Sequence, residues 1–356
     1  MEEEAVDKME MKDDPSSSRT YCVTGATGYI GSSLVETLLQ RGCTVHATLR
    51  DPEKSLHLMS LWAGGDRLRL FKADLNEEGS FDEAVKGCDG VFHVAASMEF
   101  NVDDKKNIES YVQESIIDPA IRGTLNLLKS CLKYKNSVKR VVFTSSISTI
   151  TAKDNDGKWK QIVDESCQVQ ADHVWNTQAS GWVYALSKLE SEEAAFKYAE
   201  ENEIDLVSVI ATTVAGPFFT ANVPSSLKVL LSPITGEPQF YKILNAVNSR
   251  MGSIALVHIE DICNAHIFLM ENDKAQGRYI CSSLSCPLSN LANLLDKHYS
   301  NSNIRRVAEK NYDKVPCEIS SNKLKDLGFS YKHGLEDIIN QTIMCCLDYG
   351  YLPPIS

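Results

Sequence analysis

The segment Tyr21-Cys-Val-Thr-Gly-Ala-Thr-Gly-Tyr-Ile-Gly31 decides the fold. A short apolar run leads into glycines, and residues 30–40 continue with apolar side chains at helical spacing. A strand that turns into a helix through glycines leaves backbone N–H groups pointing out of the helix start, where the helix dipole attracts a phosphate. Gly25 permits the turn, Gly28 lets the backbone approach a pyrophosphate, and Gly31 lets the helix pack closely on the strand. The segment therefore predicts the first β-α unit of a dinucleotide-binding fold.

Strand-like and helix-like segments alternate through the first part of the chain. Apolar runs typical of buried strands alternate with amphipathic stretches, which predicts β-α-β units and a parallel sheet with helices on both faces. The expected strands are residues 44–49, 68–71, 90–95, 141–144 and 205–210, and the expected helices are residues 30–40, 120–134 and 183–201. The predicted fold class is α/β, a Rossmann doubly wound parallel sheet with a smaller mixed C-terminal lobe.

The alternation fades after about residue 217, where prolines divide the chain into loops and short helices. We expect a disordered acidic tail at residues 1–18, which carry seven carboxylates. Residues 19–216 form the predicted dinucleotide-binding domain, and residues 217–356 form most of a substrate-binding lobe. A strand near residues 254–260 is expected to rejoin the large sheet.

Composition narrows the class of partner. The 356 residues carry a formal net charge of −12 and are 43% hydrophobic and 24% charged, as globular domains are. An acidic chain without a basic run is a poor nucleic-acid binder, and no apolar stretch approaches the ~20 residues that span a bilayer. Eleven irregularly spaced cysteines are typical of reduced thiols. We therefore expect a cytoplasmic protein that binds a small molecule, with no nucleic acid and no membrane span.

The second expected strand ends at Leu49-Arg50-Asp51. A carboxylate at that point binds the adenosine ribose of NAD, whereas an arginine clamps the 2′-phosphate of NADP. We favour NADPH with Arg50 as the phosphate ligand, although Asp51 keeps NAD open as an alternative. Asp74, after the third strand, accepts a hydrogen bond from the adenine amine or simply caps a helix. The small residues Val94-Ala95-Ala96 let the backbone pass beneath the nicotinamide ribose.

Three side chains, in a fixed order along the chain, suit hydride transfer. Tyr184 and Lys188 are four residues apart and share one helix face, and Ser146 closes an apolar run. A phenol with a pKa of about 10 is a poor proton donor or acceptor at neutral pH, so we expect the Lys188 ammonium to lower the pKa of Tyr184 and to hold the nicotinamide ribose. Ser146 polarises a substrate carbonyl. The hypothesis is that NADPH delivers hydride while Tyr184 delivers the proton.

Other chemistry fits the sequence less well. A metal site is not expected, because no His-x-x-x-His or His/Cys cluster occurs among His93, His173, His258 and His266. The pair Ser145-Ser146 lacks the glycines that surround a hydrolase nucleophile.

Segments spread over most of the chain are similar to those of one enzyme family. They are residues 23–31, 91–95, 138–146, 181–188, 223–227, 232–235, 258–267 and 277–283. The chain resembles the extended short-chain dehydrogenases/reductases, and more narrowly the plant dihydroflavonol reductase and anthocyanidin reductase group, from about residue 20 to about residue 352. The resemblance implies that Ser146, Tyr184 and Lys188 form a catalytic triad, that Arg50 binds the 2′-phosphate and that Asp74 meets adenine.

The resemblance also implies which residues contact the ligands. Together with the residues argued above, the expected cofactor-binding set is Gly25, Thr27, Gly28, Tyr29, Ile30, Gly31, Arg50, Asp74, Leu75, Val94, Ala95, Ala96, Tyr184, Lys188, Ala211, Thr213, Val214 and Ser226, with Ser232 as an alternative to Ser226. The expected substrate-binding set is Ser97, Met98, Ser148, Thr151 and Phe219. The segment after Ala211 and the C-terminal lobe build the substrate cleft. Both a monomer and a homodimer stay open.

Thr151 bears on the choice within the group. Dihydroflavonol reductases tend to carry an asparagine or aspartate five residues past the catalytic serine, where it touches the flavonoid B-ring hydroxyls. Here that position is Thr151, as in anthocyanidin reductases, so we expect reduction of an anthocyanidin to a flavan-3-ol. The alternatives are a dihydroflavonol 4-reductase, a reductase of another plant carbonyl metabolite such as a terpenoid, alkaloid or steroid, and a non-catalytic protein that senses dinucleotides.

Overall fold

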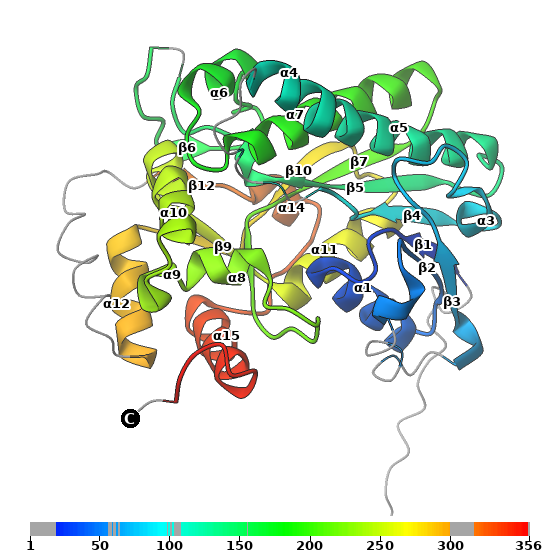
Figure 1. Ribbon diagram of the computed structural model, residues 1–356. Helices are drawn as coiled ribbons and strands as arrows, with labels where there is room; N and C mark the ends of the chain where they lie inside the picture. The colour runs from blue at the N-terminus through cyan, green and yellow to red at the C-terminus, as the bar shows by residue number, and fades with distance from the viewer. Residues whose placement is uncertain are drawn as a thin grey trace, which may run out of the picture.

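A seven-stranded parallel sheet forms the centre of the protein (Figure 1). The computed structural model describes residues 19–55, 59, 62, 65–97, 99, 102, 108–154, 156–299 and 317–354, so the acidic tail expected at residues 1–18 lies outside the described residues. The strand order is β10-β7-β5-β4-β1-β2-β3. The strands are β1 (Thr20–Val23), β2 (Thr44–Leu49), β3 (Leu68–Lys72), β4 (Gly90–His93), β5 (Arg140–Ser146), β7 (Leu206–Ala211) and β10 (Gly277–Cys281). The predicted α/β fold with a doubly wound parallel sheet is confirmed.

Helices cover both faces of this sheet, which is why β5 and β7 are buried along their whole length (Figure 1). On one face, apolar side chains of the sheet pack against α1 (Tyr29–Gln40) and α11 (Ile259–Glu271). On the other face they pack against α3 (Asp82–Val85), α5 (Asp118–Lys133) and α7 (Trp182–Glu201). Because all neighbouring strands of this sheet are parallel, their carboxyl ends lie at one edge of the sheet.

The strand order reverses between β1 and β4, because β2 and β3 continue from β1 in one direction while β4, β5 and β7 continue in the other. At such a switch point, neighbouring connections leave the sheet toward opposite faces and open a crevice beyond the carboxyl ends of the strands.

A second sheet, of three strands, lies beside the first. It contains β8 (Thr213–Ala215), β9 (Ile254–His258) and β11 (Leu284–Cys286), in the order β11-β9-β8. The prediction that a strand near residues 254–260 rejoins the large sheet is wrong, because β9 pairs with β8 and β11 instead. Only Thr212 separates β7 from β8, so the chain leaves the large sheet there and offers β8 as a new edge for β9. The large sheet is completed by β10, which pairs with β7.

Most of the remaining helices build the C-terminal lobe around the second sheet. They are α8 (Ser225–Leu230), α9 (Ser232–Thr235), α10 (Pro238–Met251), α12 (Leu288–His298) and α15 (Leu335–Asp348), whereas α14 (Asn322–Asp326) packs against β10 of the large sheet. The shorter elements are the helical turns η2 (Pro52–Ser55), η3 (Gly65–Arg67) and η5 (Ile147–Thr149), the π-helix η4 (Gln113–Ile117), and the helices α4 (Ile108–Val112) and α6 (Ala171–Thr177). A small parallel sheet pairs β6 (Ile162–Val163) with β12 (Glu318–Ile319).

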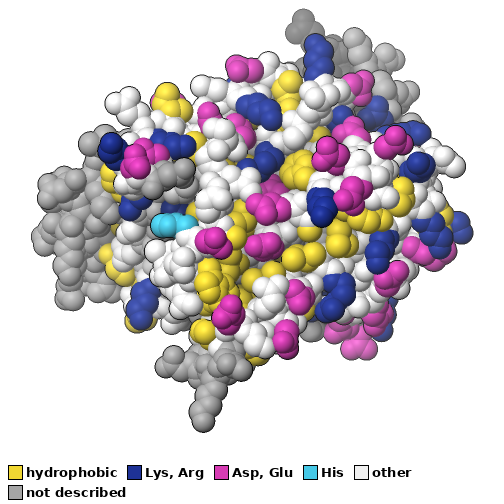
Figure 2. Space-filling view, turned by 90° about the horizontal axis from the view of Figure 1, so that it is seen from above, with side chains coloured by type: hydrophobic (Ala, Val, Ile, Leu, Met, Phe, Trp, Pro, Cys, Tyr) yellow, Lys and Arg dark blue, Asp and Glu magenta, His cyan; other side chains and the backbone are white. Residues whose placement is uncertain are grey.

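The outer face over α5 and α7 is chemically mixed. Figure 2 shows acidic and basic side chains interspersed there, with apolar side chains exposed between them. Within the part of the chain that the structure describes, no helix combines the length and the apolar character needed to cross a bilayer.

Candidate active site

A cavity of about 760 Å³ opens at the carboxyl ends of the parallel strands. Its walls come from the turn after β1, the ends of β2, β3, β4, β5 and β7, and from α5, α7 and the start of α8. The cavity therefore occupies the switch point at which doubly wound sheets bind their ligands. Its volume is within the range of small-molecule and cofactor pockets.

The glycine turn is packed so tightly that two of its glycines have no room for a side chain. Gly25 has a φ of +67°, and a Cβ placed on it would lie 2.8 Å from the Cα of Ala95. A Cβ on Gly31 would lie 2.2 Å from the carbonyl oxygen of Gly25. Gly28 precedes α1 with extended backbone and no capping side chain. The first N–H groups of α1 thus face the cavity without a competing side-chain acceptor from this residue.

Thr24 joins the glycine turn to the end of β4. Its Oγ1 accepts hydrogen bonds from the backbone N–H groups of Val94 (3.1 Å) and Ala95 (3.0 Å), and its hydroxyl lies 3.0 Å from Nδ1 of His93. Burial, aided by the charge of Lys188, lowers the pKa of His93 to about 3, so the imidazole is neutral at physiological pH. Nδ1 of the neutral ring accepts a hydrogen bond from the Thr24 hydroxyl, and this bond links the end of β1 to the end of β4. Thr24 belongs to the glycine motif, but its role in joining the end of β1 to the end of β4 was not predicted from the sequence.

Arg50 and Asp51 face different surroundings at the tip of β2. Arg50 lines the cavity. Asp51 is not among the lining residues, and its Oδ1 accepts the backbone N–H of Glu53 at 3.1 Å. Asp51 therefore stabilises the turn η2, while the arginine is the charged group that this strand end presents to the cavity.

Asp74 lines the cavity and also closes a turn. Its Oδ1 accepts hydrogen bonds from the backbone N–H of Asn76 (2.9 Å) and from the Asn76 side chain (3.2 Å), while its backbone carbonyl accepts the hydroxyl of Ser80 (2.7 Å). The capping role considered from the sequence is thus present as turn stabilisation. The place of Asp74 in the cavity wall leaves its predicted contact with adenine as a prediction.

Ser146, Tyr184 and Lys188 meet on the cavity wall. The end of β5 carries Ser146, and successive turns of α7 carry Tyr184 and Lys188. The Tyr184 and Ser146 hydroxyls share a hydrogen bond. The Lys188 Nζ donates to the backbone carbonyl of Thr144 at 2.8 Å and lies 5.4 Å from the centroid of the Phe143 ring. The three side chains predicted from the sequence to act together therefore lie together on one wall of the cavity.

The pKa of Tyr184 departs from the sequence-based expectation. Burial raises the pKa of Tyr184 above its ordinary value and outweighs the opposing hydrogen bond with Ser146. Burial also lowers the pKa of Lys188 to about 8, against the opposing charge of Glu192. The prediction that Lys188 lowers the pKa of Tyr184 is therefore wrong for the protein without bound ligands, in which the pKa is raised. A phenol with a raised pKa is fully protonated at neutral pH, which is the form that donates a proton.

Most residues expected to bind ligands from the sequence lie together around the cavity. Those that line it are Gly25, Thr27, Gly28, Tyr29, Ile30, Gly31, Arg50, Asp74, Leu75, Val94, Ala95, Ala96, Ser97, Ser146, Tyr184, Lys188, Ala211, Val214 and Ser226. Those that do not are Thr213, Ser148, Thr151, Phe219 and Ser232. Met98 lies outside the described residues.

The exceptions have local reasons. Thr213 lies between Thr212 and Val214, which both line the cavity, and successive side chains of a strand point to opposite sides. The Thr151 hydroxyl accepts the backbone N–H of Lys153 at 3.3 Å. Phe219 packs against the core that α1 and α11 share with the sheet. The Ser232 hydroxyl donates to the backbone carbonyl of Val229, which belongs to the preceding helix α8.

The cavity has further walls that the sequence analysis did not identify. They are Thr48, Leu49, Ala73, Asn76, Phe81, Glu99, Ser115, Ile116, Pro119, Ala120, Thr144, Ser145, Thr212, Pro224 and Ser225. The strand-end residues among them follow from the rule that ligands bind at the carboxyl ends of parallel strands. Ser115 and Ile116 had no such signal, because a π-helical turn before α5 brings them to the cavity.

One group of possible metal ligands lies away from this cavity. Among the described residues, ligand atoms of His258, Glu260 and His333 lie within 4.8 Å of one another. However, Nδ1 of His258 accepts the backbone N–H of Glu260, and its Nε2 lies 3.1 Å from Oε1 of Gln341. His333 Nε2 lies 3.0 Å from a Glu260 carboxylate oxygen, and the two imidazole ring centroids are 3.7 Å apart at an interplanar angle of 31°. Because the ligand atoms already have hydrogen-bond partners, we propose no metal site for this group.

Comparisons with known proteins agree with this geometry. The model of the NAD dependent epimerase/dehydratase family matches residues 21–281. A putative anthocyanidin reductase of Ginkgo biloba is 48% identical over 331 residues, which cover 91% of this chain and 93% of that protein. A dihydroflavonol 4-reductase of Dianthus caryophyllus is 42% identical over 338 residues, covering 94% and 89%. The crystal structure of vestitone reductase from alfalfa superposes with a TM-score of 0.77 at 31% identity, covering 94% of this chain and 100% of that one.

The chain belongs to the NAD-dependent epimerase/dehydratase family, the extended short-chain dehydrogenases/reductases, and it is an oxidoreductase. Relatives that are 41–48% identical to it are named as a putative anthocyanidin reductase and as dihydroflavonol 4-reductases, which confirms the resemblance to the dihydroflavonol reductase and anthocyanidin reductase group.

Proposed function

We propose that the protein is an NADPH-dependent reductase that converts an anthocyanidin into a flavan-3-ol. The observation that carries the proposal is a single cavity shared by the glycine turn and by Ser146, Tyr184 and Lys188. A non-catalytic dinucleotide sensor would need the phosphate cradle alone. The presence of a hydrogen-bonded tyrosine and serine on the opposite wall supports catalysis instead.

The residues present fit a bound NADPH, which supplies the hydride. Gly25 approaches Ala95 so closely that even a methyl group would clash, as expected of a cradle shaped by backbone. Arg50 is the charged group that β2 presents to the cavity, whereas the Asp51 carboxylate is used in its own turn. This arrangement supports recognition of a 2′-phosphate and therefore NADPH in preference to NADH.

Tyr184 is the proposed proton donor. A flavylium cation becomes a flavan-3-ol by gaining two hydrides and one proton, so one acid is needed beside the hydride donor. Tyr184 is protonated because its pKa is raised, and Ser146 holds its hydroxyl in place. Lys188, one helical turn further, supplies the positive charge that stabilises the phenolate left behind.

The substrate assignment rests on the relatives. Thr151 carries no argument for it, because this residue does not line the cavity and its hydroxyl accepts the backbone N–H of Lys153. The Ginkgo biloba relative named a putative anthocyanidin reductase is 48% identical, while the relatives named dihydroflavonol 4-reductases are 40–42% identical. Those several dihydroflavonol 4-reductases make reduction of a dihydroflavonol at C4 the second candidate.

The experiment is a substrate comparison with purified enzyme. Anthocyanidins, dihydroflavonols and unrelated ketones are each supplied with NADPH or NADH, and cofactor oxidation and products are followed. The proposal expects a flavan-3-ol from the anthocyanidin and a higher kcat/KM with NADPH. Preferred formation of a leucoanthocyanidin from the dihydroflavonol would establish the second candidate, and turnover confined to other ketones would reject both.

A further inference from the structure

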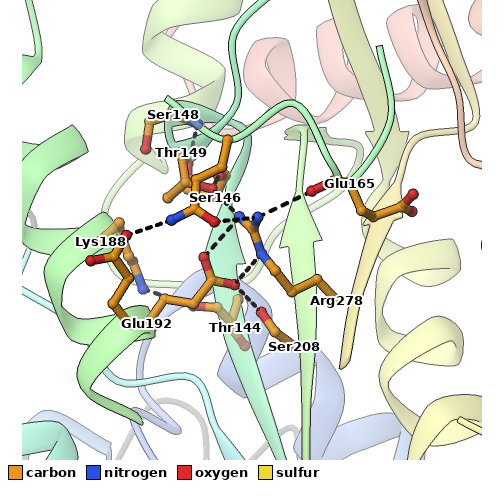
Figure 3. A network of polar contacts seen from close by, with 11 residues as sticks. Thr144, Ser146, Ser148, Thr149, Glu165, Lys188, Glu192, Ser208 and Arg278 are labelled. Atoms are coloured by element: carbon orange, nitrogen blue, oxygen red, sulfur yellow. Dashed lines mark hydrogen bonds and ion pairs between the residues drawn. The ribbon is translucent and has the colours of Figure 1, made fainter. Parts of the chain in front are cut away.

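A buried ion pair lies directly behind the proposed catalytic residues. Glu192 follows Lys188 by one turn of α7, and its side chain is 2% exposed. Arg278 of β10 faces it, with Nη2 3.0 Å from Oε2 and Nε 3.2 Å from Oε1, so the contact is bidentate. Ser208 of β7 donates its hydroxyl to the same carboxylate (Figure 3). One carboxylate therefore joins a helix to two neighbouring strands.

Each N–H group of the Arg278 guanidinium has an acceptor. Besides the two bonds to the carboxylate, Nη1 donates to the Gln168 side chain (2.9 Å) and to the Glu165 carbonyl (3.2 Å), and Nη2 donates to Oγ1 of Thr149 (2.9 Å). The guanidinium has five donors in a rigid plane. A plane with every donor engaged has little freedom to rotate, so it transmits the position of one partner to another.

The Thr149 hydroxyl completes the connection to the active site. It donates to the backbone carbonyl of Ser146 at 2.9 Å. In the same turn, the backbone N–H of Ser148 donates to Oγ of Ser146 at 3.2 Å. A continuous hydrogen-bonded path thus runs from Glu192, on the helix of Tyr184 and Lys188, to the catalytic serine at the end of β5 (Figure 3).

The chemistry of the pair argues against a purely stabilising role. Removing two charged groups from water is unfavourable, and well-packed apolar side chains of similar volume often stabilise a fold as well or better. A buried ion pair with a fixed geometry is instead suited to holding elements in one arrangement. Here the elements are those whose separation sets the distance between Ser146 and Tyr184.

We propose that Glu192 and Arg278 are positioning residues, which hold the helix carrying Tyr184 and Lys188 at a fixed distance from the strand end carrying Ser146. This inference rests on the proposed function. It assigns to these residues no contact with substrate or cofactor, because neither lines the cavity.

The arrangement also places a negative charge near the Lys188 ammonium. Among the described residues, the titratable groups with an electrostatic effect between them and Lys188 are Glu192, on its own helix, and His93 at the end of β4, where the imidazole is neutral; Tyr184 precedes Lys188 by one turn of the same helix. Glu192 is thus the anion that opposes loss of the Lys188 proton. Neutralising Glu192 removes that support and leaves the Arg278 cation unpaired nearby, and both changes disfavour the ammonium.

The main test is Glu192→Gln, which keeps the shape of the side chain and removes its charge. We expect kcat to fall about tenfold or more, since small misplacements of reacting groups carry penalties of this order. We expect the affinity for NADPH to stay within about twofold, since the phosphate cradle is built by other elements. The alkaline limb of the kcat profile should move about one pH unit lower, as Coulomb estimates give for charges one helical turn apart.

A second variant keeps the test decisive if Glu192→Gln folds poorly. Thr149→Val removes one hydroxyl, preserves volume and leaves the ion pair intact. It breaks the link from Arg278 to Ser146 and leaves a buried guanidinium N–H and the Ser146 carbonyl without this partner, so we expect the melting temperature to fall as well as kcat. The KM and the alkaline limb should stay close to those of the wild type, because the ion pair remains. Arg278→Lys, which keeps the charge without the planar donors, should retain the wild-type alkaline limb but not the wild-type kcat.

Asp205→Asn is the matched control. It breaks another ion pair of the large sheet, with Arg140 at 2.7 Å, at the opposite end of β5 from Ser146. This control should alter stability alone. Wild-type kcat and pH profiles in both Glu192→Gln and Thr149→Val would overturn the positioning role, as would an equal effect of Asp205→Asn. An absence of NADPH oxidation by the wild type with every anthocyanidin, dihydroflavonol and ketone tested would instead refute the proposed function, and this inference with it.

Discussion

Gly31→Ala tests whether the glycine turn positions the helix that is expected to bind the pyrophosphate. The added Cβ would lie 2.2 Å from the Gly25 carbonyl oxygen and 2.9 Å from its carbonyl carbon. Both atoms are backbone, so no side-chain rotation can relieve the contact. An ordinary Cβ contact needs at least ~3.2 Å between such atoms, so α1 must move by about 1 Å relative to β1.

This displacement has two measurable consequences. Overpacking of this kind destabilises proteins by about 1–3 kcal/mol, and the better helix propensity of alanine offsets about 1 kcal/mol of that loss. We therefore expect the free energy of unfolding to fall by up to about 2 kcal/mol. The N–H groups at the start of α1 also move out of hydrogen-bonding range of a phosphate. Losing one charge-assisted hydrogen bond weakens binding by about 1.5–3 kcal/mol, so the Kd for NADPH should rise at least about tenfold.

The assays are urea unfolding and NADPH titration by calorimetry. Gly157→Ala is the control, because Gly157 has a φ of +78° and no atom lies within 4 Å of the position that its Cβ would take. That variant carries the conformational cost of a left-handed residue, about 1–2 kcal/mol, without displacing α1. Unchanged NADPH affinity in Gly31→Ala, with the loss of stability present, would refute the link between this close packing and the cofactor cradle.

Three further predictions concern the proposed chemistry. Tyr184→Phe should lower kcat by about 10²–10⁴-fold, the usual contribution of a general acid, while NADPH titration shows nearly unchanged affinity; wild-type turnover would reject the proton donor. Because the pKa of Lys188 is lowered to about 8 and its ammonium is the useful form, kcat should fall as the pH rises through about 8; a flat profile up to pH ~10, the ordinary range of lysine, would contradict this role. Arg50→Ala should raise the Kd for NADPH but not for NADH. As a control, Asp51→Ala should change neither Kd by more than about twofold, since a group outside the ligand site contributes little. Equal increases in the Kd of both cofactors in Arg50→Ala would show that the 2′-phosphate is bound elsewhere.

Much of the fold could be predicted because its signals are local. The expected strand at residues 44–49 has the bounds of β2, and the helix expected at residues 183–201 differs from α7 by one residue at its start. Apolar runs, helical periodicity and glycines report directly on backbone conformation within a few residues.

Parts of the candidate site were beyond this kind of reasoning. Ser115 and Ile116 reach the cavity through a π-helical turn, for which the local sequence has no recognised pattern. The raised pKa of Tyr184 comes from burial by distant elements rather than from its neighbour Lys188. Both features depend on how elements pack, and the spacing of residues along the chain does not contain that information.

The sequence by itself determined the glycine turn and the pairing of Tyr184 with Lys188 on one helix face. Both are local, because the turn at Gly25 and the four-residue spacing each act within one short segment of the chain. Only the tertiary structure decided that β10, rather than β9, completes the large sheet, and that Arg278 meets a carboxylate 86 residues earlier in the chain. The physical reason is that strand pairing and buried ion pairs are selected by competition between distant segments for the same edge or charge. That competition is resolved only when the whole chain has packed.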